Sequence, residues 1–296
     1  METLVAVLVS TLSLAAGYGL LAIGISLTWS SLGLLNLAHG ITFGFAGYGA
    51  WWFGTEVSAN PVGVVIAGVV TGAFTGLVVV AVAFLPIKRQ ENFPVRSLTI
   101  TLALNLVGTQ ILLRVFGPKA KNIPSVFTFD SINLFGTVIL PDRTGMIVTA
   151  AVVLLATLIW FRRSRSGLRV RALMQNPEGA ALVGVSLNRT AVVVMMVSGA
   201  LAGLSAVLLQ EIFFASPYSW STPLIKGLVI ALLGGLGSIP GALLAALVLG
   251  ATEAGTARFV GGQYVLYTQF ALVVGVLLAR PRGIGGLLDE VREADE

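Results

Sequence analysis

The residues that could carry chemistry in this 296-residue chain are few, and the first group interrupts an apolar stretch. Asn36 and His39, the only histidine, lie in the run Gly33-Leu34-Leu35-Asn36-Leu37-Ala38-His39-Gly40. No Asp, Glu, Lys or Arg occurs in residues 3–55. Polar groups at membrane depth are costly unless they are satisfied, and interrupted helices that carry them mark solute pathways in transporters. We therefore interpret Asn36, His39 and Gly40 as candidates for a substrate pathway.

Each polar residue of this run also has a structural interpretation. Gly33 and Gly40 flank the pair and predict a helix that is interrupted or closely packed there. Asn36 is expected to satisfy backbone groups that the interruption frees. His39 could line the path or hydrogen-bond a neighbouring helix, and the sequence leaves both roles open.

A second group of candidates lies in the C-terminal third. Gly235 and Gly237 belong to the run Gly234-Gly235-Leu236-Gly237-Ser238-Ile239-Pro240-Gly241, and Lys226 precedes it. Lys226 could attract a carboxylate at the outer mouth of a pathway, or extend its ammonium group to the membrane interface. If the chain between Lys226 and Glu253 returns to the same surface, these two residues are expected to form a structural ion pair.

Several classes of chemistry lack the residues they need. The chain has no cysteine and one histidine, and it has no cluster of intramembrane carboxylates, so neither hydrolysis nor metal binding is predicted. No Gly-x-x-x-x-Gly-Lys-Ser/Thr run is present to cradle phosphates. We predict that the chain itself binds no cofactor and no metal.

The composition identifies the elements that must position these residues. Hydrophobic residues make up 56% of the chain and charged residues only 10%, whereas soluble domains carry about 25% charge. Apolar stretches reach the roughly 20 residues that a membrane-spanning helix needs, and the short alternating segments of a barrel are missing. We predict an all-α, polytopic integral membrane protein that forms a single domain over residues 1–296. The predicted full crossings lie near 4–28, 33–54, 61–86, 97–116, 143–161, 190–210 and 262–279.

Basic residues set the expected orientation. The net charge of +5 comes from residues at the ends of apolar stretches, which favours the positive-inside effect over nucleic-acid binding. Cytoplasmic placement of these residues puts the N-terminus and residues 117–142 outside. The basic groups are Lys88, Arg89 and Arg96; Arg162, Arg163, Arg165, Arg169, Arg171 and Arg189; and Arg280, Arg282 and Arg292.

The region 222–252 is predicted to enter the membrane and return. A single crossing there would turn the last span outward and place Arg280 on the wrong side. The run 234–241 offers a break, because glycines end one half-helix and Pro240 suits the first turn of the next. Two full crossings are not expected, because each arm would have only about 12–15 residues. One kinked span with a weak charge bias is the alternative.

The basic segment 162–189 is the third informative region, and it is too polar to span the membrane. Leu168, Ala172 and Leu173 recur at helical spacing, and Asn176-Pro177 then separates this helix from a second short one. An interfacial helix whose arginines bind lipid head groups is one interpretation. A short helix presented to a groove on a cytosolic partner is the other, and the helix–proline–helix pattern favours it.

Three motifs together resemble the permeases of branched-chain amino acid ATP-binding cassette (ABC) importers. Residues 33–40 are similar to the Asn-Phe-Ala-His-Gly run of that family. Residues 167–184 resemble its coupling loop for ATPase subunits, and Lys226, residues 233–241, Gly250 and Glu253 resemble its C-terminal segment. The resemblance covers roughly residues 10–285. It implies ATPase contacts at Gly167, Arg171, Ala172, Gln175, Asn176, Pro177, Glu178, Ala181 and Gly184.

The resemblance also implies partners and a location. It predicts a multi-pass subunit of the inner (plasma) membrane that works by ATP-driven alternating access. The partners would be two cytosolic ATPases that bind the ATP, a second homologous permease in a heterodimer, an external substrate-binding protein, and membrane lipid. Ile41 stands where many members have an acidic residue, so permeases for urea, short amides or other small solutes remain alternatives. An ion-coupled secondary transporter is a further alternative, although spans 61–116 offer no intramembrane carboxylate for it.

Overall fold

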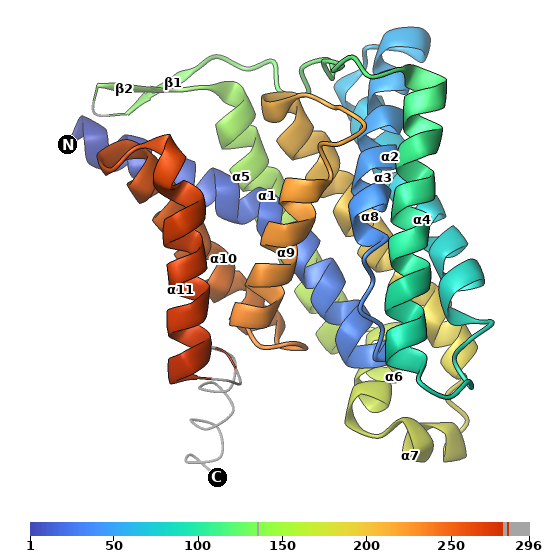
Figure 1. Ribbon diagram of the computed structural model, residues 1–296. Coiled ribbons are helices and arrows are strands. Elements are labelled where there is room, and N and C mark those ends of the chain that lie inside the picture. The colour runs from blue at the N-terminus through green and yellow to red at the C-terminus, as the bar shows by residue number, and fades with distance from the viewer. Residues whose placement is uncertain (135, 281–282, 284–296) are drawn as a thin grey trace.

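Helices dominate the computed structural model, which describes residues 1–134, 136–280 and 283 (Figure 1). Arg282 and Arg292, which the sequence places in the cytoplasm, lie outside the described residues. Two π-helical turns, Phe53–Val57 and Val80–Phe84, extend α2 and α3, and a 3-10 turn, Gly262–Tyr264, precedes α11. The elements in chain order are α1 (Glu2–Leu32), α2 (His39–Trp52), α3 (Pro61–Val79), α4 (Phe93–Phe116), β1 (Ile132–Leu134), β2 (Thr137–Ile139), α5 (Pro141–Arg163), α6 (Arg165–Gln175), α7 (Pro177–Leu182), α8 (Leu187–Phe213), α9 (Ser221–Leu233), α10 (Ile239–Phe259) and α11 (Val265–Ala279).

Seven helices of the described residues are long and apolar enough to cross a membrane: α1, α3, α4, α5, α8, α10 and α11. All-α membrane architecture is therefore confirmed. The set of long helices differs from the prediction in two places, because α2 is shorter than expected and α10 is longer.

The helix is interrupted before His39, as the sequence predicts. α1 ends at Leu32, where Gly33 adopts φ 63° and its N–H bonds the carbonyl of Trp29. This left-handed conformation suits glycine, which has no Cβ to clash. Residues 33–38 are not helical, and α2 begins at His39. The π-helical turn that follows α2 ends at Val57. Segment 33–57 thus combines an extended entrance with a helix (Figure 1).

The predicted hairpin is present, but its arms are unequal. α9 has 13 residues, as expected, whereas α10 has 21 and reaches membrane-crossing length, so the expected 12–15 residues for the second arm are wrong. Gly234 ends α9, and the Ser238 hydroxyl accepts the N–H of Gly241 at 3.1 Å to cap α10. Capping with Pro240 in the first turn lets the long second arm start directly after the break.

The ends of the elements separate into two opposite faces (Figure 1). The N-terminus and the antiparallel strands β1 and β2 lie at one face, whereas α6 and α7 lie at the other (Figure 1). α11 runs from the first face towards the second (Figure 1). Placement of α6 and α7 at the cytoplasmic face stays a prediction from the basic residues.

α1 is the central helix of the bundle. It packs against α5, α8, α9 and α10, and the side chains of residues 20–23 are fully buried. The long apolar faces of α4 and α11 are instead exposed, as expected for helices that meet lipid or another chain.

α3 and α8 cross with backbone-to-backbone contact. A Cβ added at Gly72 would clash with the carbonyl oxygen of Gly199, and one added at Gly203 would clash with the carbonyl oxygen of Gly68. Small residues at such spacing let two membrane helices approach closely, where dispersion and weak hydrogen bonds stabilise them. This pair of helices packs against α2.

Candidate translocation pathway and coupling surface

The interrupted segment before α2 is held by α4. The Thr101 hydroxyl lies 3.2 Å from the backbone N of Leu37 and 3.4 Å from the carbonyl oxygen of Leu35. Thr101, and not Asn36, therefore satisfies the backbone that the break frees, and the expectation for Asn36 is wrong. The Asn36 Oδ1 atom is buried and has no hydrogen-bond partner among the described residues.

Gly40 is the point where two elements, α4 and the start of α9, converge on α2. A Cβ at this position would lie 2.8 Å from the Trp220 ring, 3.0 Å from Leu224 and 3.3 Å from the Asn105 Oδ1 atom. Trp220 and Leu224 come from the start of α9, and Asn105 comes from α4. Glycine at position 40 thus lets the short arm of the hairpin and α4 both approach α2 closely.

His39 lies on the other side of α2, between α1 and α8. A Cβ added at Gly24 would lie 2.9 Å from the His39 Nε2 atom and 3.0 Å from the Ser198 carbonyl oxygen. His39 is 1% exposed, and its Nε2 atom has no partner in the described part of the chain. The ring therefore packs at a three-helix contact, which fits the interpretation as a packing residue.

Unpaired polar atoms gather along α2 and its neighbours. Besides Asn36 and His39, both amide atoms of Asn105, the Tyr48 hydroxyl, the Gln210 Oε1 and the Trp220 Nε1 are buried without a partner in the part of the chain that the structure describes. A buried orphan polar group costs roughly 1–3 kcal/mol, so a protein retains several only where water or a solute can meet them. These atoms, on α2, α4, α8 and α9, are therefore candidates for contact with a small polar solute.

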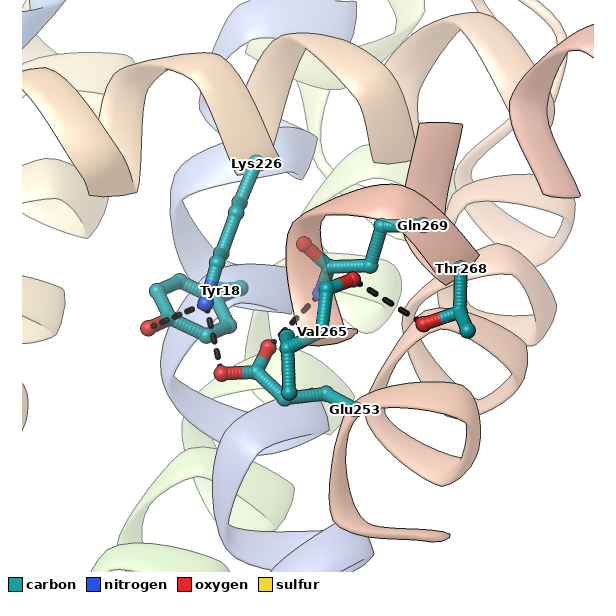
Figure 2. A network of polar contacts seen from close by, with 6 residues as sticks. All are labelled: Tyr18, Lys226, Glu253, Val265, Thr268 and Gln269. Carbon is teal, nitrogen blue, oxygen red and sulfur yellow. Dashed lines mark hydrogen bonds and ion pairs between the residues drawn. The ribbon is translucent and has the colours of Figure 1, made fainter. Parts of the chain in front are cut away.

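Lys226 forms a polar network that joins four helices (Figure 2). Its Nζ lies 2.6 Å from the Glu253 Oε1 on α10, 3.3 Å from the Tyr18 hydroxyl on α1, and 4.7 Å from the centre of the Tyr18 ring. The second carboxylate oxygen of Glu253 accepts the Gln269 amide of α11 at 2.9 Å. The predicted ion pair is confirmed, and Lys226 does not extend to the membrane interface, because its side chain is 10% exposed.

The tip of the hairpin touches both α1 and α6. Gly235 and Gly237 adopt positive φ angles of 82° and 106°, and the Gly237 N–H donates to the Ser26 hydroxyl at 2.9 Å. A Cβ at Gly237 would lie 3.8 Å from the Met174 methyl group of α6. The two glycines therefore shape the tip, which lies close to α6.

α6 is anchored to the end of α5. The Ser164 hydroxyl caps α6 by accepting the Gly167 N–H at 2.8 Å, and Gly167 packs on the carbonyl groups of Trp160 and Phe161. Arg171 donates to the Arg162 carbonyl oxygen at 2.9 Å and lies over the Phe161 ring. Gly167 and Arg171 thus hold the loop in place and do not form its outer surface.

The prediction of which residues form the apolar face of α6 is partly wrong. Leu173 is 2% exposed, as the helical spacing predicts, whereas Leu168 is 60% exposed. Val170 takes the buried place instead, at 0% exposed. Because Gly167 packs directly on the end of α5, it turns α6 so that the positions three and six residues later face the bundle.

α7 presents the outermost surface of the loop. The Asn176 side chain caps α7 by accepting the Gly179 N–H at 2.8 Å, and Gly184 ends the turn with φ 84°. Leu182 and Val183 are 89% and 79% exposed, which leaves two adjacent apolar side chains uncovered. The remaining candidates of the loop are exposed or half-buried around them: Ala172, Gln175, Pro177, Glu178 and Ala181.

Sequence reasoning missed several residues of these sites. Asn105 and Thr101 lie in a span that looks like ordinary membrane helix, and Gln210 sits near the end of another. Their polarity within apolar stretches was the available signal. For Leu182, the available signal was its position beside Val183, as two adjacent apolar residues in a polar loop.

Comparison with known proteins identifies the family that this sequence resembles. The sequence matches the family described as "Branched-chain amino acid transport system / permease component" over residues 7–279. The high-affinity branched-chain amino acid permease protein BraD of Pseudomonas aeruginosa is 31% identical, with 94% of each chain covered. The corresponding protein LivH of Escherichia coli is 30% identical, with 93% of this chain and 92% of that protein covered.

A solved structure supports the fold. PsaBC from Streptococcus pneumoniae, in complex with a Fab, superposes with a TM-score of 0.51 at 13% identity, covering 94% of this chain and 91% of that chain. At this identity the likeness concerns the fold alone. The match across nearly the whole sequence, together with the multi-pass helical fold, shows that this chain belongs to the family of permease components of branched-chain amino acid transport systems.

Proposed function

We propose that this chain is the membrane-spanning permease of an ABC importer for branched-chain or related small amino acids. The observation that carries the proposal is the convergence of Asn105, Trp220 and Leu224 on Gly40, beside buried polar atoms that lack partners. A solute with a polar head and an apolar side chain fits such a mixed lining. Full-length similarity to BraD and LivH supports branched-chain amino acids as its substrates.

The proposed mechanism is alternating access driven from the cytoplasmic face. ATPase subunits would press on α7 through Leu182 and Val183, and α6 would pass the movement to Gly237 through Met174. The hairpin would then shift α9 against Gly40 and change access to the pathway. The Lys226–Glu253 ion pair positions α9 on α10 during this movement.

The proposed assembly follows from the family. The chain would work in the inner membrane with two cytosolic ATPases, a second homologous permease and an external substrate-binding protein. The exposed apolar faces of α4 and α11 leave room for contact with lipid and with the second permease. ATP would bind to the ATPase subunits only.

Transport by the reconstituted complex tests this proposal. Proteoliposomes that contain the permease, its partner permease and the ATPases would be supplied with the cognate binding protein, ATP and radiolabelled L-leucine, L-isoleucine or L-valine. ATP-dependent uptake of at least one of these solutes is expected. Uptake of urea, short amides, nucleosides or sugars alone, or uptake without ATPase subunits, would refute it.

Replacement of Asn105 separates a pathway role from a packing role. Asn105→Leu removes two buried orphan atoms and keeps the volume, so the melting temperature of the complex is expected to stay equal or rise. Transport is expected to fall about tenfold, which corresponds to about 1.4 kcal/mol lost from solute binding. Thr99→Val, on an exposed position of the same helix, is the matched control. Unchanged transport in Asn105→Leu would show that Asn105 does not line the path.

The exposed apolar pair of α7 allows a test of coupling. Leu182→Asp places a charge where a partner groove would close over an apolar side chain, so ATPase subunits are expected to co-purify at least tenfold less. Val138→Asp changes an apolar residue that is 60% exposed on the opposite face, and it is expected to leave the complex intact. Equal recovery of ATPase subunits with both variants would contradict the coupling role of α7.

A further inference from the structure

A cavity outside the proposed pathway lies near the external ends of four helices. It has a volume of about 330 Å³ and is formed by α1, α5, α8 and α10. Its floor is buried: Ser13, Met146, Leu209 and Ala254 are between 1% and 6% exposed. Its rim includes Phe213 and Arg258, which are exposed, so the cavity opens to the surface. These helix ends lie at the face opposite α6 and α7.

Two guanidinium groups line the cavity. Arg143, in the first turn of α5, donates to the Ser10 hydroxyl at 2.9 Å, and Arg258 lies in the last turn of α10. Neither arginine belongs to the ion pair of the described residues, which is formed by Lys226 and Glu253. A cation in the first turn of a helix also lies at the positive end of the helix dipole, which raises the attraction for an anion there.

The carboxylates near the cavity already have partners. Glu253 lines the cavity but gives one oxygen to Lys226 and the other to Gln269. Asp142 accepts the backbone N–H of Arg143 at 2.8 Å, and Glu211 accepts the backbone N–H of Val126 at 2.8 Å. Among the described residues neither arginine forms an ion pair with these carboxylates, so both guanidinium groups can bind an external carboxylate.

Apolar side chains form the rest of the wall. Leu14, Met146, Leu209 and Ile212 lie opposite the charged rim. The volume is at the low end of the roughly 300–1,000 Å³ of small-molecule pockets, so it suits a small occupant. The lining therefore selects a compact molecule with an anionic head and a short apolar body.

We propose that this cavity is a receiving site for the free amino acid on the external face, with Arg143 and Arg258 binding the carboxylate and the apolar wall receiving the side chain. The inference rests on the proposed function and adds a site to it. Glu253 connects the cavity to the pathway, because its partner Lys226 stands on α9 two positions after Leu224, which packs on Gly40. A phospholipid, with a phosphate head on an apolar body, is the other source of the same chemistry.

Binding of L-leucine and L-leucinamide to the complex in nanodiscs, without the external binding protein, tests the site. Leucinamide keeps the side chain and the amine but lacks the carboxylate. The unaltered complex is expected to bind leucine at least tenfold more tightly than leucinamide. Arg143→Gln/Arg258→Gln is expected to lose this discrimination and to raise the KM of leucine transport, while basal ATPase activity and elution volume stay unchanged. Arg114→Gln, on α4 away from the cavity, is the matched control.

Three outcomes would overturn the inference. Leucine binding with equal affinity by the double variant and the unaltered complex would exclude the two arginines. Native mass spectrometry that finds phosphatidylglycerol retained by the unaltered complex and lost from the double variant, with leucine binding unaffected, would assign the cavity to lipid. Failure of the unaltered proteoliposomes to take up any branched-chain amino acid would overturn the proposed function as well, whereas normal uptake with either of the first two results would leave that function intact.

Discussion

Lys226→Met is expected to destabilise the permease by about 3–5 kcal/mol, because it leaves the Glu253 carboxylate buried without its cation. Glu253 would retain only the Gln269 amide, which cannot neutralise a charge. The Tyr18 hydroxyl on α1 would lose its contact with the ammonium group at the same time. A large drop in the temperature at which the detergent-solubilised protein aggregates, followed by size-exclusion chromatography, measures this loss.

The double variant Lys226→Met/Glu253→Gln provides the thermodynamic control. It removes both charges, so most of the stability is expected to return, and the two single effects should be strongly non-additive. Lys119→Met, at an exposed position, controls for the loss of one positive charge and is expected to have little effect. Additive losses in the double variant would show that the ion pair is not the interaction that holds α9.

Gly72→Leu is expected to have the largest effect on folding. A side chain at position 72 would meet the Gly199 carbonyl oxygen and the Gly203 backbone, neither of which can rotate away. α3 and α8 would have to separate along their whole contact, which costs on the order of 3 kcal/mol or more. Recovery of monodisperse protein after membrane extraction is expected to fall at least tenfold.

Gly275→Leu is the matched control for this change. Gly275 also lies inside a membrane-length helix, but a Cβ there would meet nothing within 4 Å. Leucine also has a higher helix propensity than glycine, so this variant is expected to fold as well as the unaltered protein. Similar recovery of both variants would show that the approach of α3 to α8 is not under close steric constraint.

The parts of the architecture that depend on short stretches of sequence could be predicted from the sequence. The apolar lengths predicted most spans, and Gly33 and Ser238-Ile239-Pro240 marked the two interruptions because left-handed glycine and proline-led helix starts are short-range features. The basic residues of segment 162–189 predicted that α6 and α7 lie outside the apolar bundle, since charge is excluded from the membrane.

The length of α10 could not be predicted in the same way. Its sequence contains Glu253 and Thr256, which interrupt the apolar pattern, so hydropathy predicts that the apolar region ends at residue 252. In the structure Glu253 is compensated by Lys226 and Gln269, and Thr256 contacts Thr268 at 3.0 Å. Tertiary partners thus extend a helix that hydropathy alone would end.

The residues of the candidate site could likewise be predicted only where the signal is local. Asn36, His39 and Gly40 were visible because they interrupt an apolar run, but the partners of Gly40 come from distant spans. Thr101 took the backbone-satisfying role expected of Asn36 because α4 passes directly beside the break. The hydrogen-bond partner of a freed backbone group depends on how the helices pack. A single sequence does not give that packing.

The unequal hairpin has an electrostatic consequence. At its tip the C-terminal end of α9, with a partial negative charge of about half an electron, lies beside the N-terminal end of α10, with a partial positive charge of similar size. The two ends largely cancel at a distance while each keeps a strong local field. The hairpin therefore adds little net field to the face at which α6 and α7 lie.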